Sequence, residues 1–276
     1  MKRSILFLFV LLNISDGFAQ HKTLTWMAIG SSSTYMNGKP ELTKYRMTEG
    51  YMDRVVDKLP YIKYVNHGHS GWTTKSIADN IDKLGLEKAD FYSVLLGSND
   101  WWLALPLGTL NDYTNNTGNQ TMYGAYRTII NKIRSLNSNP IIILITPSQR
   151  TDYVDVNNKA SFIYGCYKAK DGHYLSEYAD VVKSIAKAEN FELVDAYYKS
   201  GITVKNAVKY RRLRDPKTGA YKNYKYPDYI NIPYNPATDD YPYPIEAIGM
   251  TYDGLHPSNK GYAKIAKMLV KVMKKY

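Results

Sequence analysis

The sequence predicts an α/β protein with a doubly wound, five-stranded parallel sheet. Short apolar runs alternate five times with segments whose apolar residues recur at helical spacing. Two of these runs, at residues 91–96 and 141–145, are continuously apolar, as is typical of strands buried on both faces. Right-handed crossovers between such strands give a flavodoxin-like sandwich with the strand order 2-1-3-4-5.

In the first half of the chain, the apolar run at 24–29 (LTWMAI) is the first predicted strand. Residues 50–59 (GYMDRVVDKL) are amphipathic at helical spacing and predict a helix. Residues 62–65 form the second strand and residues 74–84 the next helix. The run at 91–96 (FYSVLL) is the third strand.

The second half continues this alternation. A helical pattern at 122–135 precedes the run IIILI at 141–145, which is the fourth strand. A helix at 175–189 then leads into the fifth strand at 191–194. The chain closes with a helix at 259–274.

Two stretches depart from this alternation. Residues 101–120 read as a long loop, and residues 200–252 are rich in Tyr, Pro, Lys and Asp with little periodicity. Loops of this length in a compact domain are usually functional or disordered, and the aromatic content argues against disorder. We therefore expect one domain, 20–276, with a Tyr-rich insertion at about 200–252. Its tyrosines would either contact substrate or pack over the last edge of the sheet.

The first nineteen residues have the features of an export signal. Lys2 and Arg3 precede an apolar run at 5–12, and Ala19 suits cleavage before Gln20. This run is well short of the roughly 20 residues that span a membrane. We therefore predict an exported protein, periplasmic or secreted, with no integral membrane span.

Composition excludes several classes of protein. Of the 276 residues, 44% are hydrophobic and 22% charged, which rules out a disordered or collagenous chain. The net charge of +11 in an exported protein indicates a solvated surface or an anionic envelope partner, and not nucleic acid. A single cysteine, Cys166, excludes an intramolecular disulfide and any Cys-based metal cluster.

Polar, glycine-containing blocks follow the first three strands, and a fourth precedes the last helix. They are 30–34 (GSSST), 66–74 (NHGHSGWTT), 97–102 (GSNDWW) and 253–257 (DGLHP). Because ligands bind outside the carboxyl ends of parallel strands, we expect these blocks to meet at one edge of the sheet.

The residue types in these blocks suit nucleophilic acyl transfer. A serine on a tight turn becomes a nucleophile when a histidine takes its proton and a carboxylate orients that histidine, and Asp253 and His256 can supply both groups. Donors for the tetrahedral intermediate would be the N–H groups of Ser32 and Gly71 and the Asn99 amide.

The four blocks, in this order, resemble the SGNH/GDSL hydrolases, a family named for Ser, Gly, Asn and His in four separate blocks. The resemblance spans roughly residues 23–276 and implies the SGNH hydrolase fold. It implies that Ser32 is the nucleophile and that Gly71 and Asn99 complete the oxyanion hole. Asp253 and His256 would finish the triad.

One position departs from the family pattern. The first block usually reads Gly-Asp-Ser, but Ser31 stands here in place of the aspartate. We take Ser32 as the nucleophile because it keeps the family's spacing from Gly30. Trp101 and Trp102, beside Asn99, either wall the acyl pocket or pack in the core.

Other readings of these blocks predict different chemistry. His67 and His69 are spaced to lie on one side of a strand, but no third ligand is near in sequence, so we expect no metal and no cofactor. The loop 30–34 could instead cradle a phosphate, as in flavodoxins, which would leave His256 without a role. A catalytically decayed binding protein is a further alternative.

The sequence thus favours a secreted or periplasmic serine esterase, or acylhydrolase, that cleaves carboxylic esters. Its substrate would be a small-molecule, carbohydrate or lipid ester.

Overall fold

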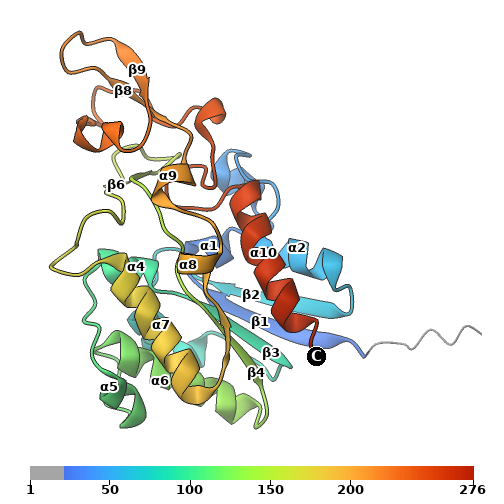
Figure 1. The fold of residues 1–276 in the computed structure, drawn as a ribbon. Coiled ribbons are helices and arrows are strands. Elements are labelled where there is room, and N and C mark those ends of the chain that lie inside the picture. Colours follow the sequence, from blue (N-terminus) through green and yellow to red (C-terminus); the bar gives the residue numbers. More distant parts are fainter. Residues whose placement is uncertain (1–21) are drawn as a thin grey trace, which may run out of the picture.

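The computed structural model describes residues 22–276, so the export signal predicted over residues 1–19 lies outside the described residues. Its centre is a five-stranded, all-parallel sheet in the order β2-β1-β3-β4-β7, which confirms the predicted order (Figure 1). The strands are β1 (Leu24–Gly30), β2 (Ile62–Gly68), β3 (Phe91–Leu95), β4 (Ile141–Ile145) and β7 (Glu192–Val194).

The register of the sheet brings the strand ends to one level. Gly30 at the end of β1 pairs with Gly68 of β2 and with Leu95 of β3. Leu95 in turn pairs with Ile145, and Ile145 with Val194. The loops that follow all five strands therefore start from the same edge.

Helices cover both faces of the sheet, as the continuous apolar strands predict (Figure 1). On one face lie α3 (Thr74–Asp79), α6 (Met122–Leu136) and α7 (Leu175–Glu189), packed on alternate strand residues such as Ile29 and Val94. On the other face lie α2 (Tyr51–Lys58) and α10 (Asn259–Met273), packed on the intervening residues.

The limits of one helix and one loop differ from those predicted from the sequence. The helix expected at 74–84 ends at Asp79, because Asn80 leaves helical geometry and its side chain donates to the Ser76 carbonyl. A 3₁₀ turn at Ile81–Lys83 follows. The loop expected at 101–120 contains α5 (Leu110–Thr114), which is too short to give a periodic signal.

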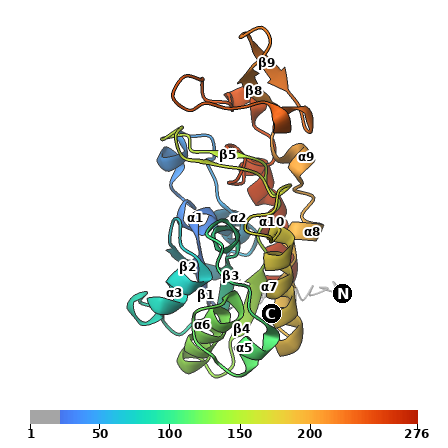
Figure 2. The same ribbon diagram turned by 90° about the vertical axis from the view of Figure 1, so that its left-hand side faces the viewer.

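The insertion has ordered elements that its composition did not predict. It holds α9 (Val204–Ala207), the hairpin of β8 (Arg211–Arg214) and β9 (Tyr221–Tyr224), and two 3₁₀ turns at Asp228–Asn231 and Ile245–Ala247. It rises above the carboxyl edge of the sheet, and in the turned view β5 (Tyr153–Val154) lies between it and α1 (Ser32–Tyr35) (Figure 2).

A small apolar cluster of its own holds the insertion together. Tyr229 and Tyr243 are fully buried against Leu213, Val208 and Val154. These two tyrosines therefore pack, which is one of the two roles expected for the Tyr-rich segment.

A buried ion pair anchors the insertion to the segment after β4. Asp152 accepts a hydrogen bond from the Arg211 guanidinium, and both side chains are buried. The same carboxylate accepts the Gly165 N–H at 2.7 Å and the Tyr167 hydroxyl. One carboxylate thus joins its own segment to residues 165–167 and to Arg211, which lies 59 positions away in sequence.

Across residues 22–276, none of the helices combines the length and the apolar character needed to cross a membrane.

We predict that Asp152→Asn lowers the free energy of unfolding by about 3–5 kcal/mol, since it leaves the Arg211 cation buried without its partner. Urea unfolding followed by circular dichroism measures the change. The exposed Asp228 of the same insertion provides the control, because Asp228→Asn should stay within about 0.5 kcal/mol of the original protein. Equal stability of the two variants would contradict the anchoring role.

Candidate active site

Ser32 is the first residue of α1, directly after β1. Backbone hydrogen bonds hold this turn: the Ser31 carbonyl accepts the N–H groups of Thr34 at 3.1 Å and Tyr35 at 2.9 Å. The Ser31 side chain makes no capping hydrogen bond to the helix. The departure from the usual aspartate therefore leaves the turn that carries Ser32 in place.

The end of β2 packs directly against α1. A Cβ atom at Gly68 would lie 2.2 Å from the Tyr35 nitrogen, so only glycine allows this approach. The Asn66 amide donates to the Thr34 carbonyl at 2.9 Å, and the His69 N–H donates to the Gly30 carbonyl at 2.9 Å. These contacts place the loop that carries Gly71 beside Ser32.

Asn99 lies in α4 (Ser98–Trp102), and one N–H of its side-chain amide donates to the Trp72 carbonyl at 2.9 Å. An amide nitrogen carries two donors, so the second is left for the space beside Ser32. Within the described residues, no protein group takes up the backbone N–H of Ser32 or of Gly71. The three residues that carry these donors line the same cavity.

Buried Asp100 holds two of these loops together. Its carboxylate accepts the Thr74 N–H at 2.8 Å, the Thr74 hydroxyl and the Gly97 N–H at 3.1 Å. Burial raises the pKa of Asp100, and the bonds from Thr74 and Gly97 partly offset that rise. The Asp100 carboxylate therefore holds the start of α4, the helix that carries Asn99.

The loop before α10 brings the carboxylate and the imidazole together. Asp253 accepts the N–H groups of Leu255 at 3.0 Å and His256 at 2.7 Å. The loop is pinned from outside by the Thr151 N–H, which donates to the Gly254 carbonyl at 3.0 Å. Gly254 has φ +93°, and a Cβ there would lie 1.8 Å from the Asp152 carbonyl oxygen.

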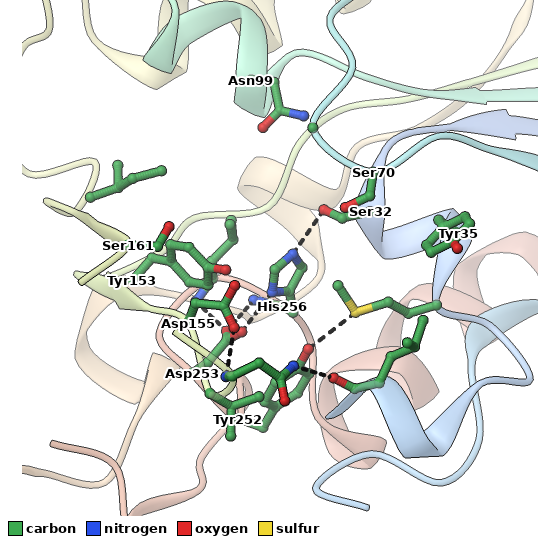
Figure 3. Close-up of a pocket in the computed structure, with 17 residues that line it drawn as sticks. Ser32, Tyr35, Ser70, Asn99, Tyr153, Asp155, Ser161, Tyr252, Asp253 and His256 are labelled. Atoms are coloured by element: carbon green, nitrogen blue, oxygen red, sulfur yellow. Dashed lines mark hydrogen bonds and ion pairs between the residues drawn. The ribbon is translucent and has the colours of Figure 1, made fainter. Parts of the chain in front are cut away.

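A continuous hydrogen-bond chain links the three side chains (Figure 3). His256 Nδ1 lies 2.6 Å from Asp253 Oδ2, and His256 Nε2 lies 2.8 Å from Ser32 Oγ. Because a carboxylate only accepts, Nδ1 carries the proton, which leaves the Nε2 lone pair to accept the Ser32 hydroxyl. This arrangement is suited to drawing a proton from Ser32.

Aromatic rings enclose His256. Tyr252 stacks on the imidazole at a centroid distance of 5.8 Å, and Tyr153 meets it edge-on at 5.4 Å. Both members of the Asp253–His256 pair are buried, and this low exposure to water strengthens their electrostatic interaction.

The chain of hydrogen bonds opens into a cavity of about 360 Å³ (Figure 3). The structure brings all five predicted chemical residues to its wall: Ser32, Gly71, Asn99, Asp253 and His256. The rest of the wall comes from the segments after β1, β2 and β4 and from the last loop: Tyr35, Met36, Leu42, Ser70, Tyr153, Asp155, Val156, Asn157, Ser161, Ile163, Tyr252 and Leu255.

Comparison with known proteins agrees with this geometry. The model of the GDSL-like lipase/acylhydrolase family matches residues 28–264. The chain belongs to this family. No protein with a curated description matches the chain.

Several solved structures share the fold. A possible lipase from Chitinophaga pinensis is 49% identical with a TM-score of 0.90, and the match covers 91% of this chain and 98% of that one. A lipolytic protein from Desulfitobacterium hafniense, described as a putative member of the G-D-S-L family, is 17% identical with a TM-score of 0.50, over 90% and 99% of the two chains. An acetyl xylan esterase, AlAXEase, is 16% identical with a TM-score of 0.52, over 90% and 99%.

The two tryptophans considered for the acyl pocket do not line it, which corrects that assignment. Trp101 is fully buried in the core, and its indole N–H donates to the His173 carbonyl at 2.9 Å. Trp102 packs edge-on against Tyr164 at 5.0 Å and has Lys170 over its ring. Both follow Asn99 on α4, but the helix turns them away from Ser32.

The sequence did not predict one wall of the cavity. The hairpin of β5 and β6 (Phe162–Ile163) carries Tyr153, Asp155 and Ser161 to the site. It has no motif, but it follows β4 at the same carboxyl edge as the other blocks. Inspection of that edge alone could have pointed to it.

The two histidines considered for a metal lie at the end of β2 and just after it. His69 stacks on Trp72 at 4.3 Å, and burial lowers the pKa of both His67 and His69. Among residues 22–276, no group of three or more His, Cys, Asp or Glu side chains gathers in a way that could hold a metal ion. Cys166 is buried, and its thiol donates to the Arg150 carbonyl.

We predict that Gly254→Ala lowers the free energy of unfolding by more than the roughly 1–2 kcal/mol that a positive φ alone costs, because the new methyl group meets the Asp152 carbonyl. Gly85→Ala is the matched control: Gly85 also has a positive φ, but its Cβ would have open space. Thermal unfolding of both variants gives the comparison, and equal losses would show that the contact does not matter.

Proposed function

We propose that this protein is a serine esterase that hydrolyses carboxylic esters, with Ser32 as nucleophile, His256 as general base and Asp253 as its orienting carboxylate. The observation that carries the proposal is the chain from Ser32 Oγ through His256 to Asp253 at the wall of an open cavity. Membership of a family of lipases and acylhydrolases supports it.

The proposed reaction uses these contacts step by step. His256 Nε2 takes the Ser32 proton as Oγ attacks the ester carbonyl, and the Asp253 carboxylate stabilises the imidazolium that forms. The carbonyl oxygen becomes an oxyanion among the N–H groups of Ser32 and Gly71 and the Asn99 amide. His256 then protonates the leaving alcohol, and water, activated by the same histidine, releases the acid from Ser32.

The wall of the cavity carries polar side chains among its apolar ones. Ser70, Asn157 and Ser161 line it alongside the reacting groups, and they offer hydroxyl and amide contacts. Such groups suit the hydroxyls of a carbohydrate that bears an acyl group better than a long lipid chain. One structural neighbour is described as an acetyl xylan esterase, and its low identity restricts that likeness to the fold.

The features of the first nineteen residues support export to the periplasm or beyond. We therefore expect the mature protein to begin at Gln20. Intact-mass analysis of protein expressed from the full sequence tests this expectation, and an unprocessed N-terminus in an exporting host would contradict it.

We predict that Ser32→Ala lowers kcat/KM for an aryl acetate by about 10⁴-fold or more, because the nucleophile is lost. Ser31→Ala and Ser33→Ala are matched controls, since both residues flank Ser32 and neither bonds to His256. Both should keep most of the activity in a steady-state assay. A larger loss in either control than in Ser32→Ala would mean that the nucleophile is misassigned.

We predict that Asn99→Ala lowers kcat by about 10²–10³-fold with little change in KM, because an oxyanion donor acts mainly in the transition state. Asn137→Ala is the control, since it also removes an amide bonded to a backbone carbonyl, but far from the cavity. Steady-state kinetics measure both variants. An unchanged kcat for Asn99→Ala would remove Asn99 from the oxyanion hole.

A further inference from the structure

The cavity is acidic in a basic protein. The chain carries a net charge of +11, yet no Lys or Arg lines the cavity of about 360 Å³. Its charged wall residues are Asp155 and Asp253, with His256 beside them. Asp253 is buried and committed to His256. Asp155 is half-buried, and within residues 22–276 no ion pair neutralises it.

The Asp155 carboxylate is held in place at this wall. Its Oδ1 accepts the Asn157 N–H at 2.7 Å, so the side chain is oriented by the turn that follows it. The Lys44 ammonium donates to the Val156 carbonyl at 2.8 Å, but within residues 22–276 it forms no ion pair with Asp155, and it does not line the cavity. Asp155 is therefore the carboxylate of the cavity wall that has no cationic partner.

Asp155 lies on the side of the cavity where an alcohol would leave. Figure 3 shows Asn99 at one end of the cavity and Tyr153 and Asp155 at the other, with Ser70, Ser32 and His256 in that order along one side. The carbonyl oxygen must point to the oxyanion donors, and the departing alcohol oxygen must lie near His256 Nε2 to receive its proton. The alcohol part of a bound ester therefore extends past Asp155 and Tyr153.

We propose that Asp155 selects esters whose alcohol part carries a positive charge and disfavours esters with an anionic alcohol part. This inference rests on the proposed esterase function and assigns a substrate class to its leaving-group side. The carboxylate attracts a cation a few ångströms from the ester oxygen, and the Tyr153 ring beside it offers a cation–π face. Asp155 thereby becomes a specificity-determining residue that takes no part in the chemical steps.

A matched pair of esters tests the effect of charge. Acetylcholine and 3,3-dimethylbutyl acetate have nearly the same shape, but only the first carries a positive charge. Because the ammonium also activates the ester, the ratio of the two kcat/KM values is divided by the ratio of their rates with hydroxide. We expect this normalised ratio to favour acetylcholine by about tenfold at low salt and to fall in 1 M NaCl. A normalised ratio near one at low salt would overturn the proposal.

Asp155→Asn keeps the shape of the side chain and removes its charge. In this variant the normalised ratio should fall to about one. The exposed Asp240, which does not line the cavity, provides the control, and Asp240→Asn should keep the original ratio. A preference that survives in Asp155→Asn would show that Asp155 does not select the substrate.

Binding to Ser32→Ala protein separates this inference from the proposed function, because it requires no turnover. We expect choline to bind about tenfold tighter than 3,3-dimethylbutanol in a calorimetric titration, and the difference to vanish when Asp155→Asn is added. If choline binds more tightly than 3,3-dimethylbutanol but the original protein hydrolyses neither ester, the esterase proposal is contradicted and the selection of cations is supported. Hydrolysis of both esters at equal normalised rates, with equal binding of the alcohols, would contradict the selection alone.

Discussion

The site depends on one structural constraint: the parallel strands of the sheet end in register at the same edge. Because Gly30, Gly68 and Leu95 stand side by side in register, the loops that follow β1, β2 and β3 leave the sheet at one edge. The close approach of Gly68 to the backbone of α1 then sets the distance between the first two loops. Side chains from four distant blocks consequently share one cavity.

Buried polar groups in this edge are held by specific partners and not by packing alone. Asp253 receives two backbone N–H groups and the imidazole, and Asp100 receives donors from two loops. Asp152 joins Arg211 of the insertion to the segment after β4, and its carbonyl lies against Gly254. The insertion therefore supports the loop of Asp253 and His256 from above, which links its small tyrosine core to the geometry of the site.

Much of this arrangement could be predicted from the sequence. The sheet order followed from buried apolar runs and chirality, and the family from four motifs in order, and both are confirmed. Trp101 could not be placed, because adjacent helical residues point in different directions and sequence does not show which one faces the core. The β5–β6 wall and the β8–β9 hairpin consist of strands of two to four residues, whose patterns are too short to detect.

The central claim is that one of three consecutive serines is activated by His256. A fluorophosphonate reacts with an activated serine, and peptide mapping by mass spectrometry identifies the residue that carries the adduct. The account predicts stoichiometric modification of Ser32, with Ser31 and Ser33 unmodified. An adduct on a neighbouring serine, or no adduct on folded protein, would contradict it.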